Sequence, residues 1–147
     1  LLPQMPCGGR WHGSGVDGKE IFAGWQDIPE RYHDRPSHQH NRLVRQVALD
    51  ADERRNTARE IATRLAATKS PTHVILPIKG IEEWDREGAP AHDPEGLAAF
   101  VDEMRNAIKP PVQMSEIDAH INDQAFVDTA LAIFDGWVAD GTIATGS

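Results

Sequence analysis

Apolar residues recur at helical spacing in three stretches of the chain, which cover residues 50–67, 94–108 and 123–139. Two of the stretches open with residues typical of helix starts. Asp50 and Glu53 have the spacing of a capping box, and Asp93 precedes Pro94, which suits the first helical position. We therefore expect three amphipathic helices, each burying one face.

Strands are predicted between these helices. The clearest lies within His73–Gly80, where Val74, Ile75 and Leu76 are continuously apolar and Pro77 stops the run, and a second covers Val112–Ile117. Two further runs, near 21–25 and 43–47, are also interpreted as strands. Strands that alternate with helices indicate an α/β fold. We expect a parallel sheet flanked by helices, a Rossmann-like layered arrangement, in a single domain spanning residues 1–147.

The unit formed by strand, long loop, helix and strand predicts where a ligand binds. Two strands joined in this way run parallel through a right-handed crossover, so their C-terminal ends meet at one edge. That edge brings Lys79-Gly80 beside the segment Asp118–Asp123, and open parallel sheets bind ligands at such edges. The 17 residues from Pro77 to Asp93 show no sustained period, and loops of this length in compact domains are often functional.

The segment after the second strand offers acid and base groups. Asp118 and His120 can form a carboxylate–imidazole pair, in which the carboxylate orients the ring and raises its basicity. The alternative is that His120 is a hydrogen-bonded structural residue. Asn122 and Asp123 are candidate ligand-binding residues, and one of them is expected to cap the third helix.

Two other places carry candidate chemistry. Lys79 and Gly80 together can offer an ammonium and a backbone amide to an anion, although the spacing excludes a P-loop. His38 and His40 face the same side of an extended segment, but no complete metal-binding signature is present, so we predict no metal site. His40 and Asn41 are kept as candidate ligand-binding residues.

Charge and composition narrow the partners and the compartment. A net charge of −8 argues against a nucleic-acid-binding surface, and no apolar run has the length of a membrane span. The single cysteine excludes an internal disulfide and suits a reducing compartment, so we expect a cytoplasmic protein. Because the chain starts at Leu1 without an initiator methionine, we expect a fragment of a larger protein.

Three stretches resemble a known family in order and spacing. They are His73–Gly80, then Ala91–Glu95, then the string Asp118-Ala-His-Ile-Asn-Asp123, which is the most specific. Together they resemble the C-terminal domain of the Tm-one-like ATP-binding family, an uncharacterised family that includes a plant tobamovirus-resistance protein. The resemblance implies an upstream nucleotide-binding domain, with ATP bound mainly outside this chain. The resemblance also assigns a set of residues to the edge typical of the family, without assigning them a reaction: His40, Asn41, Gly80, Asp118, His120, Asn122 and Asp123.

Two classes of function follow from these observations. The first is a small-molecule or nucleotide-linked binding domain that holds an anionic ligand through Lys79, backbone amides and His120. The second is an enzyme that uses Asp118 and His120 as an acid/base pair on a small metabolite, with metal assistance from His38 and His40 as a variant. In either case we expect the chain to associate with an upstream domain or with a second copy, because a sheet edge would otherwise stay uncovered.

Overall fold

The computed structural model describes residues 13–14, 19–23, 28–39, 41 and 43–143. The chain groups into two compact units, Leu1–Asp50 and Ala51–Ser147. Each unit has its own sheet and its own core. The single-domain organisation expected from the sequence stays a prediction.

The first unit holds a four-stranded antiparallel sheet in the order β1-β2-β4-β3. Its elements are β1 (Gly13–Ser14), β2 (Lys19–Ala23), the 3-10 helix η2 (Glu30–Tyr32), β3 (Ser37–Gln39) and β4 (Val44–Ala48). Val47 and Tyr32 form a small buried core with Ile28 beside it. Both strands expected in this region are present, but they do not belong to a parallel sheet. β4 pairs antiparallel with β2 on one side and antiparallel with β3 on the other.

The second unit contains the strand–loop–helix–strand arrangement that the sequence predicts. Its elements are α1 (Ala51–Ala66), β5 (His73–Pro77), α2 (Pro94–Ala107), β6 (Gln113–Ile117) and α3 (Gln124–Ala139). β5 and β6 pair in parallel, with His73 opposite Gln113 and Pro77 opposite Ile117. The three helices lie within one or two residues of their predicted bounds. The α/β class is therefore confirmed, with two strands in the parallel sheet.

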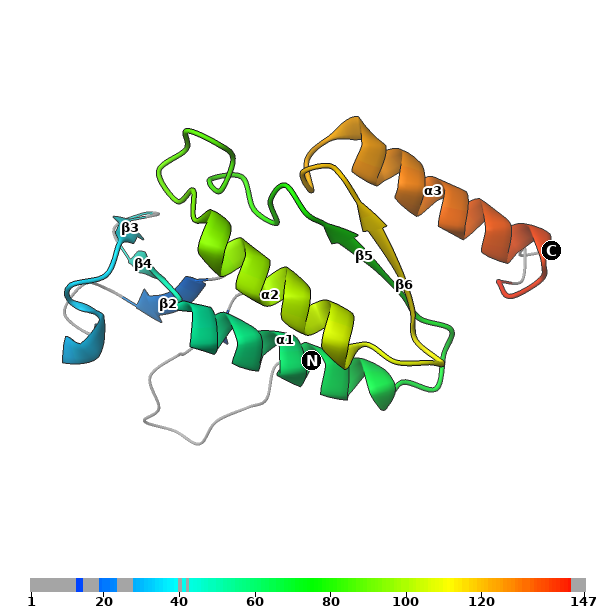
Figure 1. Cartoon of the computed structure of the whole chain (residues 1–147), viewed down its shortest axis with the longest axis horizontal. Coiled ribbons are helices and arrows are strands. Elements are labelled where there is room, and N and C mark those ends of the chain that lie inside the picture. Colours follow the sequence, from blue (N-terminus) through cyan, green and yellow to red (C-terminus); the bar gives the residue numbers. More distant parts are fainter. Residues whose placement is uncertain (1–12, 15–18, 24–27, 40, 42, 144–147) are drawn as a thin grey trace. The chain divides into compact units, whose positions relative to one another are not determined.

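The core of this unit lies where α1 and α2 pack together and against β5 (Figure 1). Leu76 of β5 and Phe100 and Met104 of α2 are its large buried residues. At the outer edge of this packing, Arg59 of α1 forms a bidentate salt bridge with Glu103 of α2. Its Nε and Nη2 donate to the two carboxylate oxygens at 2.9 and 3.0 Å. These contacts fix α2 on β5, and with it the start of α2 at Asp93.

The third helix differs from the first two. Figure 1 shows α3 on the other side of the strand pair from α1 and α2. Every residue of α3, all of which the structure describes, is at least partly exposed. Among the described residues no helix is both long enough and apolar enough to cross a membrane.

Candidate functional site

The backbone after β5 and the backbone after β6 continue to pair beyond the ends of the strands. Ile78 N donates to Ile117 O at 3.1 Å, Lys79 N to Ala119 O at 3.0 Å, and Ile121 N to Gly80 O at 2.9 Å. The two segments that the sequence placed at one edge of the sheet are therefore hydrogen-bonded neighbours. This prediction of position is confirmed.

His120 lies at the centre of this edge, with 1% of its surface exposed. Its Nδ1 accepts the backbone N–H of Asn122 at 3.1 Å, so the proton of the neutral ring is on Nε2. Nε2 then donates to the backbone oxygen of Glu82 at 2.7 Å and to Oδ1 of Asp85 at 2.9 Å. Both ring nitrogens are engaged inside the protein, as expected for a structural histidine.

Asp85 is the buried carboxylate that holds this ring. Its Oδ2 accepts the backbone N–H groups of Ile81 at 2.7 Å and Glu82 at 3.3 Å, and 7% of the residue is exposed. Gly80 packs directly on the pair at a φ of 140°, and a Cβ there would collide with both the His120 ring and the Asp85 carboxylate. A glycine is therefore required at this position by space as well as by backbone conformation.

The carboxylate predicted to pair with His120 has a different partner. Asp118 contacts Nζ of Lys79 at 3.0 Å, and both side chains are more than half exposed. The carboxylate beside the imidazole is Asp85, which lies 35 residues earlier in the chain. Sequence analysis missed Asp85 because it lies in the loop without periodicity, where no spacing connects it to His120.

Asp123 occupies the N-cap position of α3, but its side chain makes no capping bond to the helix. It folds back instead, so that Oδ2 accepts the backbone N–H of His120 at 2.9 Å and Oδ1 contacts Arg86 at 3.1 Å. The hydrogen bond from His120 and the pairing with Arg86 lower the pKa of the Asp123 carboxyl. The neighbouring Asn122 donates from its side chain to Glu83. Both residues thus tie the long loop to the start of α3.

The two remaining candidates belong to the first unit. His40 lies outside the described residues. The side-chain oxygen of Asn41 accepts the N–H groups of Leu43 at 2.8 Å and Val44 at 2.9 Å, which holds the turn before β4. Among the described residues, no group of three or more His, Cys, Asp or Glu side chains is arranged to hold a metal ion.

A cavity of about 440 Å³ opens beside this edge, between the long loop and the start of α2. Its walls combine apolar side chains with two cations and a histidine: Ile78, Pro94, Leu97, Lys79, Arg86 and His92. The remaining lining residues are four acids and a second histidine: Asp85, Glu87, Asp93, Asp123 and His120. A pocket of this size and mixed lining suits a small polar molecule.

His92 is the lining residue whose chemistry the sequence did not reveal. Its Nδ1 lies 3.1 Å from the backbone oxygen of Asp85, and a carbonyl can only accept, so Nδ1 carries the proton. In the neutral form of this exposed ring, Nε2 is then the nitrogen with a lone pair. The sequence signal was present, because His92 stands where the long loop meets the α2 cap, but it was interpreted only as part of that cap.

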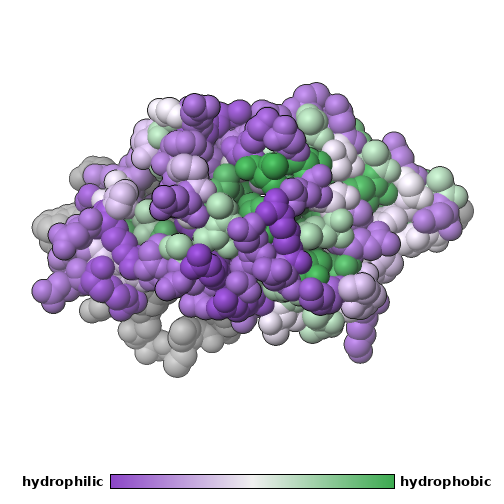
Figure 2. Space-filling model, viewed as in Figure 1, coloured by the Kyte–Doolittle hydropathy of each residue, from purple (hydrophilic) through white to green (hydrophobic). Residues whose placement is uncertain are grey.

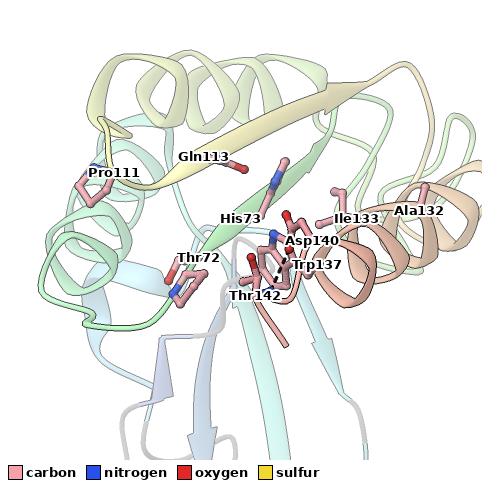
Figure 3. A pocket seen from close by; sticks show the side chains of 11 residues that line it. Thr72, His73, Pro111, Gln113, Ala132, Ile133, Trp137, Asp140 and Thr142 are labelled. Atoms are coloured by element: carbon pink, nitrogen blue, oxygen red, sulfur yellow. Dashed lines mark hydrogen bonds between the residues drawn. The ribbon is translucent and has the colours of Figure 1, made fainter. Parts of the chain in front are cut away.

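A second cavity, of about 370 Å³, lies at the other end of the strand pair, between the strands and α3 (Figure 3). His73 and Gln113 line it from the strands, and Trp137 and Asp140 from the helix side. His73 is hydrogen-bonded to Ser115 at 2.8 Å, and the hydrogen bonds from Thr142 lower the pKa of the Asp140 carboxyl. Sequence analysis placed no candidate here.

Comparison with known proteins gives one consistent result. Residues 18–138 match the model of the uncharacterised protein family UPF0261, C-terminal domain. A UPF0261 protein of Brucella melitensis is 46% identical over 84% of this chain, and the match covers 29% of that protein. A UPF0261 protein of Mesorhizobium japonicum is 34% identical over 74% of the chain and 28% of its own length. The ToMV resistance protein Tm-1 of Solanum lycopersicum is 28% identical over 73% of the chain and 14% of its own length. The chain thus spans less than a third of the curated relatives it matches.

Proposed function

Because this chain belongs to the UPF0261 family, as a C-terminal domain, and carries a ligand-sized pocket at its parallel-strand edge, we propose that it is a small-molecule-binding domain for an anionic metabolite. The match bears out the resemblance to Tm-one-like proteins. The family is uncharacterised, so the support for binding comes from the pocket itself. The activity of the longer relatives is not carried over to this chain.

The pocket of about 440 Å³ is the observation that carries the proposal. It lies at the carboxyl ends of β5 and β6, which is where open parallel sheets take ligands. Its volume falls within the range of about 300–1,000 Å³ found for small-molecule sites. Apolar walls from Ile78 and Leu97 can cover the body of a metabolite while charged groups at the rim orient it.

Two cations, Lys79 and Arg86, line the pocket, and three of the four acids that line it are engaged within the protein, Glu87 being the fourth. Asp85 is held by His120, Asp93 by Arg54 at 3.0 Å, and Asp123 by Arg86. The guanidinium of Arg86 has five N–H donors and uses two of its nitrogens on a single oxygen of Asp123. Donors of Arg86 therefore remain for a carboxylate or phosphate, and the partly exposed ammonium of Lys79 lies on the same rim.

Ligand binding can be tested by thermal unfolding and calorimetry with a panel of carboxylates, sugar phosphates and nucleotides. ATP belongs in the panel because the family resemblance implies it. We expect at least one anion to raise the melting temperature, and Arg86→Gln and Lys79→Gln to weaken its binding at least tenfold. Arg64→Gln is the matched control, because Arg64 is an exposed arginine of α1 that pairs with Glu60 away from the pocket. If Arg86→Gln and the control bind the anion equally well, this pocket is not its binding site.

The alternative function is an acid/base enzyme acting on a small metabolite, and His92 is the observation that favours it. Its Nε2 lone pair belongs to a ring held by a carbonyl through Nδ1, which is the arrangement of many general bases. An acid/base role for Asp118 and His120 requires one of the ring's hydrogen bonds, to Asn122 or to Asp85, to break first. The enzyme alternative therefore assigns the base to His92.

The two functions differ in what His92→Gln removes. In a binding domain, this substitution changes ligand affinity only. In an enzyme, turnover is lost while ligand affinity stays within a few-fold. Measuring both quantities on the first panel member that binds separates them.

A further inference from the structure

The exposed surface of α3 carries a continuous apolar stripe. Val127, Leu131 and Phe134 are 45%, 54% and 50% exposed. They are spaced four and three residues apart, so they lie in one line along the helix. Figure 2 shows hydrophobic residues at the surface on the side of the molecule where α3 lies. Stripes of this spacing normally pack against another element.

The strands beside α3 are equally incomplete. β5 and β6 form a two-stranded parallel sheet within the described residues, whereas parallel sheets normally contain more strands and are covered on both faces. One side of the pair is covered by the α1–α2 core. On the other side, α3 contacts β5, and a cavity of about 370 Å³ lies between α3 and the N-terminal ends of the two strands (Figure 3). The apolar stripe of α3, the open side of β5–β6 and the cavity between them form one surface that is suited to pack against a further element.

The charge around the stripe restricts that partner. The sequence has no Lys or Arg from residue 110 to residue 147. The stripe is bordered by Asp128 and Asp135, and Asp140 follows the helix. Two copies packed through α3 would bring these carboxylates together, and like charges across an interface are unfavourable. The partner surface should therefore be apolar and bordered by Lys or Arg.

We propose that α3 and the open side of β5–β6 dock against another part of the longer UPF0261 polypeptide, which supplies apolar side chains bordered by basic residues. More than two thirds of the Brucella melitensis relative lies outside the stretch that this chain matches, so such a segment is available in the same molecule. An intramolecular partner also suits a stripe of this modest size, because a linked segment is present at high effective concentration.

A chimera tests the proposal in a covalently complete protein. The matched stretch of the Brucella melitensis protein is replaced by this chain, and Leu131→Asp is introduced in the chimera and in the isolated chain. We expect Leu131→Asp to lower the melting temperature of the chimera by more than about 5 °C, in line with the loss of a buried leucine. In the isolated chain, where Leu131 is exposed, the melting temperature should not change.

Ala125→Asp is the matched control, because it adds the same charge at an exposed residue of α3 that lies about a third to half a turn from the residues of the stripe. Light scattering and hydrogen exchange of the isolated chain complete the test. Equal effects of the two substitutions in the chimera would overturn the proposal. So would a dimer of the isolated chain that Leu131→Asp dissociates, because the occupant would then be a second copy. A monomeric isolated chain with α3 already protected from exchange would overturn it as well.

Discussion

At the scale of single residues, the most constrained side chain is that of His120. Its two nitrogens are bonded to three partners, its ring is covered by Gly80, and the carboxylate bonded to the ring, that of Asp85, is itself buried. Removing the ring leaves the Asp85 carboxylate and the backbone of Glu82 without their shared donor. The cost of such a loss exceeds the strength of any one of the bonds.

We therefore expect His120→Ala to lower the free energy of unfolding by about 1–3 kcal/mol or more. The sequence left a hydrogen-bonded structural role for His120 as the alternative to an acid/base or ligand role. Denaturant unfolding of wild type and variant measures the difference. His92→Ala is the control, because His92 is exposed in the same pocket, and an equal effect of the two substitutions would contradict the structural role of His120.

Asp123 supplies a pH dependence whose sign follows from its contacts. Its pKa is lowered in the folded protein by the His120 N–H and by Arg86, so it stabilises the fold above the unfolded pKa of about 3.9. This contribution is lost as the pH falls through the folded pKa. The stability advantage of wild type over Asp123→Asn should therefore shrink as the pH is lowered from about 6 to about 3. Urea unfolding across this pH range measures the difference, with Asp128→Asn as a surface control. A stability difference between wild type and Asp123→Asn that stayed constant with pH would contradict the lowered pKa of Asp123.

The sequence located the edge residues but not their partners. Lys79, Gly80 and the segment Asp118–Asp123 could be placed together because both follow apolar strands, and that pattern is local. The pairing of His120 with Asp85 is not local, since it depends on how a loop without period folds over the edge. The role of His92 depends on the same loop, through the carbonyl of Asp85.

At the scale of elements, hydrophobic spacing predicted helices and strands well and strand pairing less well. The three helices begin and end within two residues of expectation, because apolar period and cap residues determine both. The antiparallel pairing of β2, β3 and β4 was not predicted, since strand propensity carries no information on direction. The cap of α3 was predicted at Asn122 or Asp123; Asp123 holds the N-cap position, but its side chain binds His120 and Arg86 and makes no capping bond.

Two glycines in different elements should respond oppositely to the same substitution. Gly80→Ala places a Cβ against His120 and Asp85 at a positive φ, so we expect it to cost more than about 2 kcal/mol. Gly136→Ala lies within α3 with open space around the new Cβ, and it should stabilise by about 0.5–1 kcal/mol. Thermal unfolding of the two variants compares them directly. A destabilising effect of Gly136→Ala would show that the new Cβ meets neighbouring atoms in this part of α3.

At the scale of the whole molecule, the chain is an α/β member of the UPF0261 family with two compact units. The main apolar cluster is drawn entirely from the second unit, from Ala58 to Met114. This cluster includes the packing of α1 on α2 and of α2 on β5. Nothing in the composition of the chain marks the boundary near Asp50, which is why one domain was the natural expectation.

A fragment of residues 50–147 should therefore fold without the first unit. We expect it to retain helical circular dichroism and a cooperative unfolding transition, because it keeps the complete cluster and the residue before α1. The full chain is the reference for both measurements. A fragment with the spectrum of an unfolded chain would instead support one domain that needs both units.

The hydrogen bonds that join the two segments beyond β5 and β6 have a kinetic consequence. The amides of Lys79 and Ile121 cross from one segment to the other, so neither can exchange its hydrogen with solvent unless the edge of the pocket separates. Their exchange rates therefore report on the opening of that edge. A ligand that enters an already formed pocket leaves the exchange of these amides unchanged or slows it. A ligand that needs the segments apart can bind no faster than they open, and the two amides exchange at that opening rate when every opening leads to exchange.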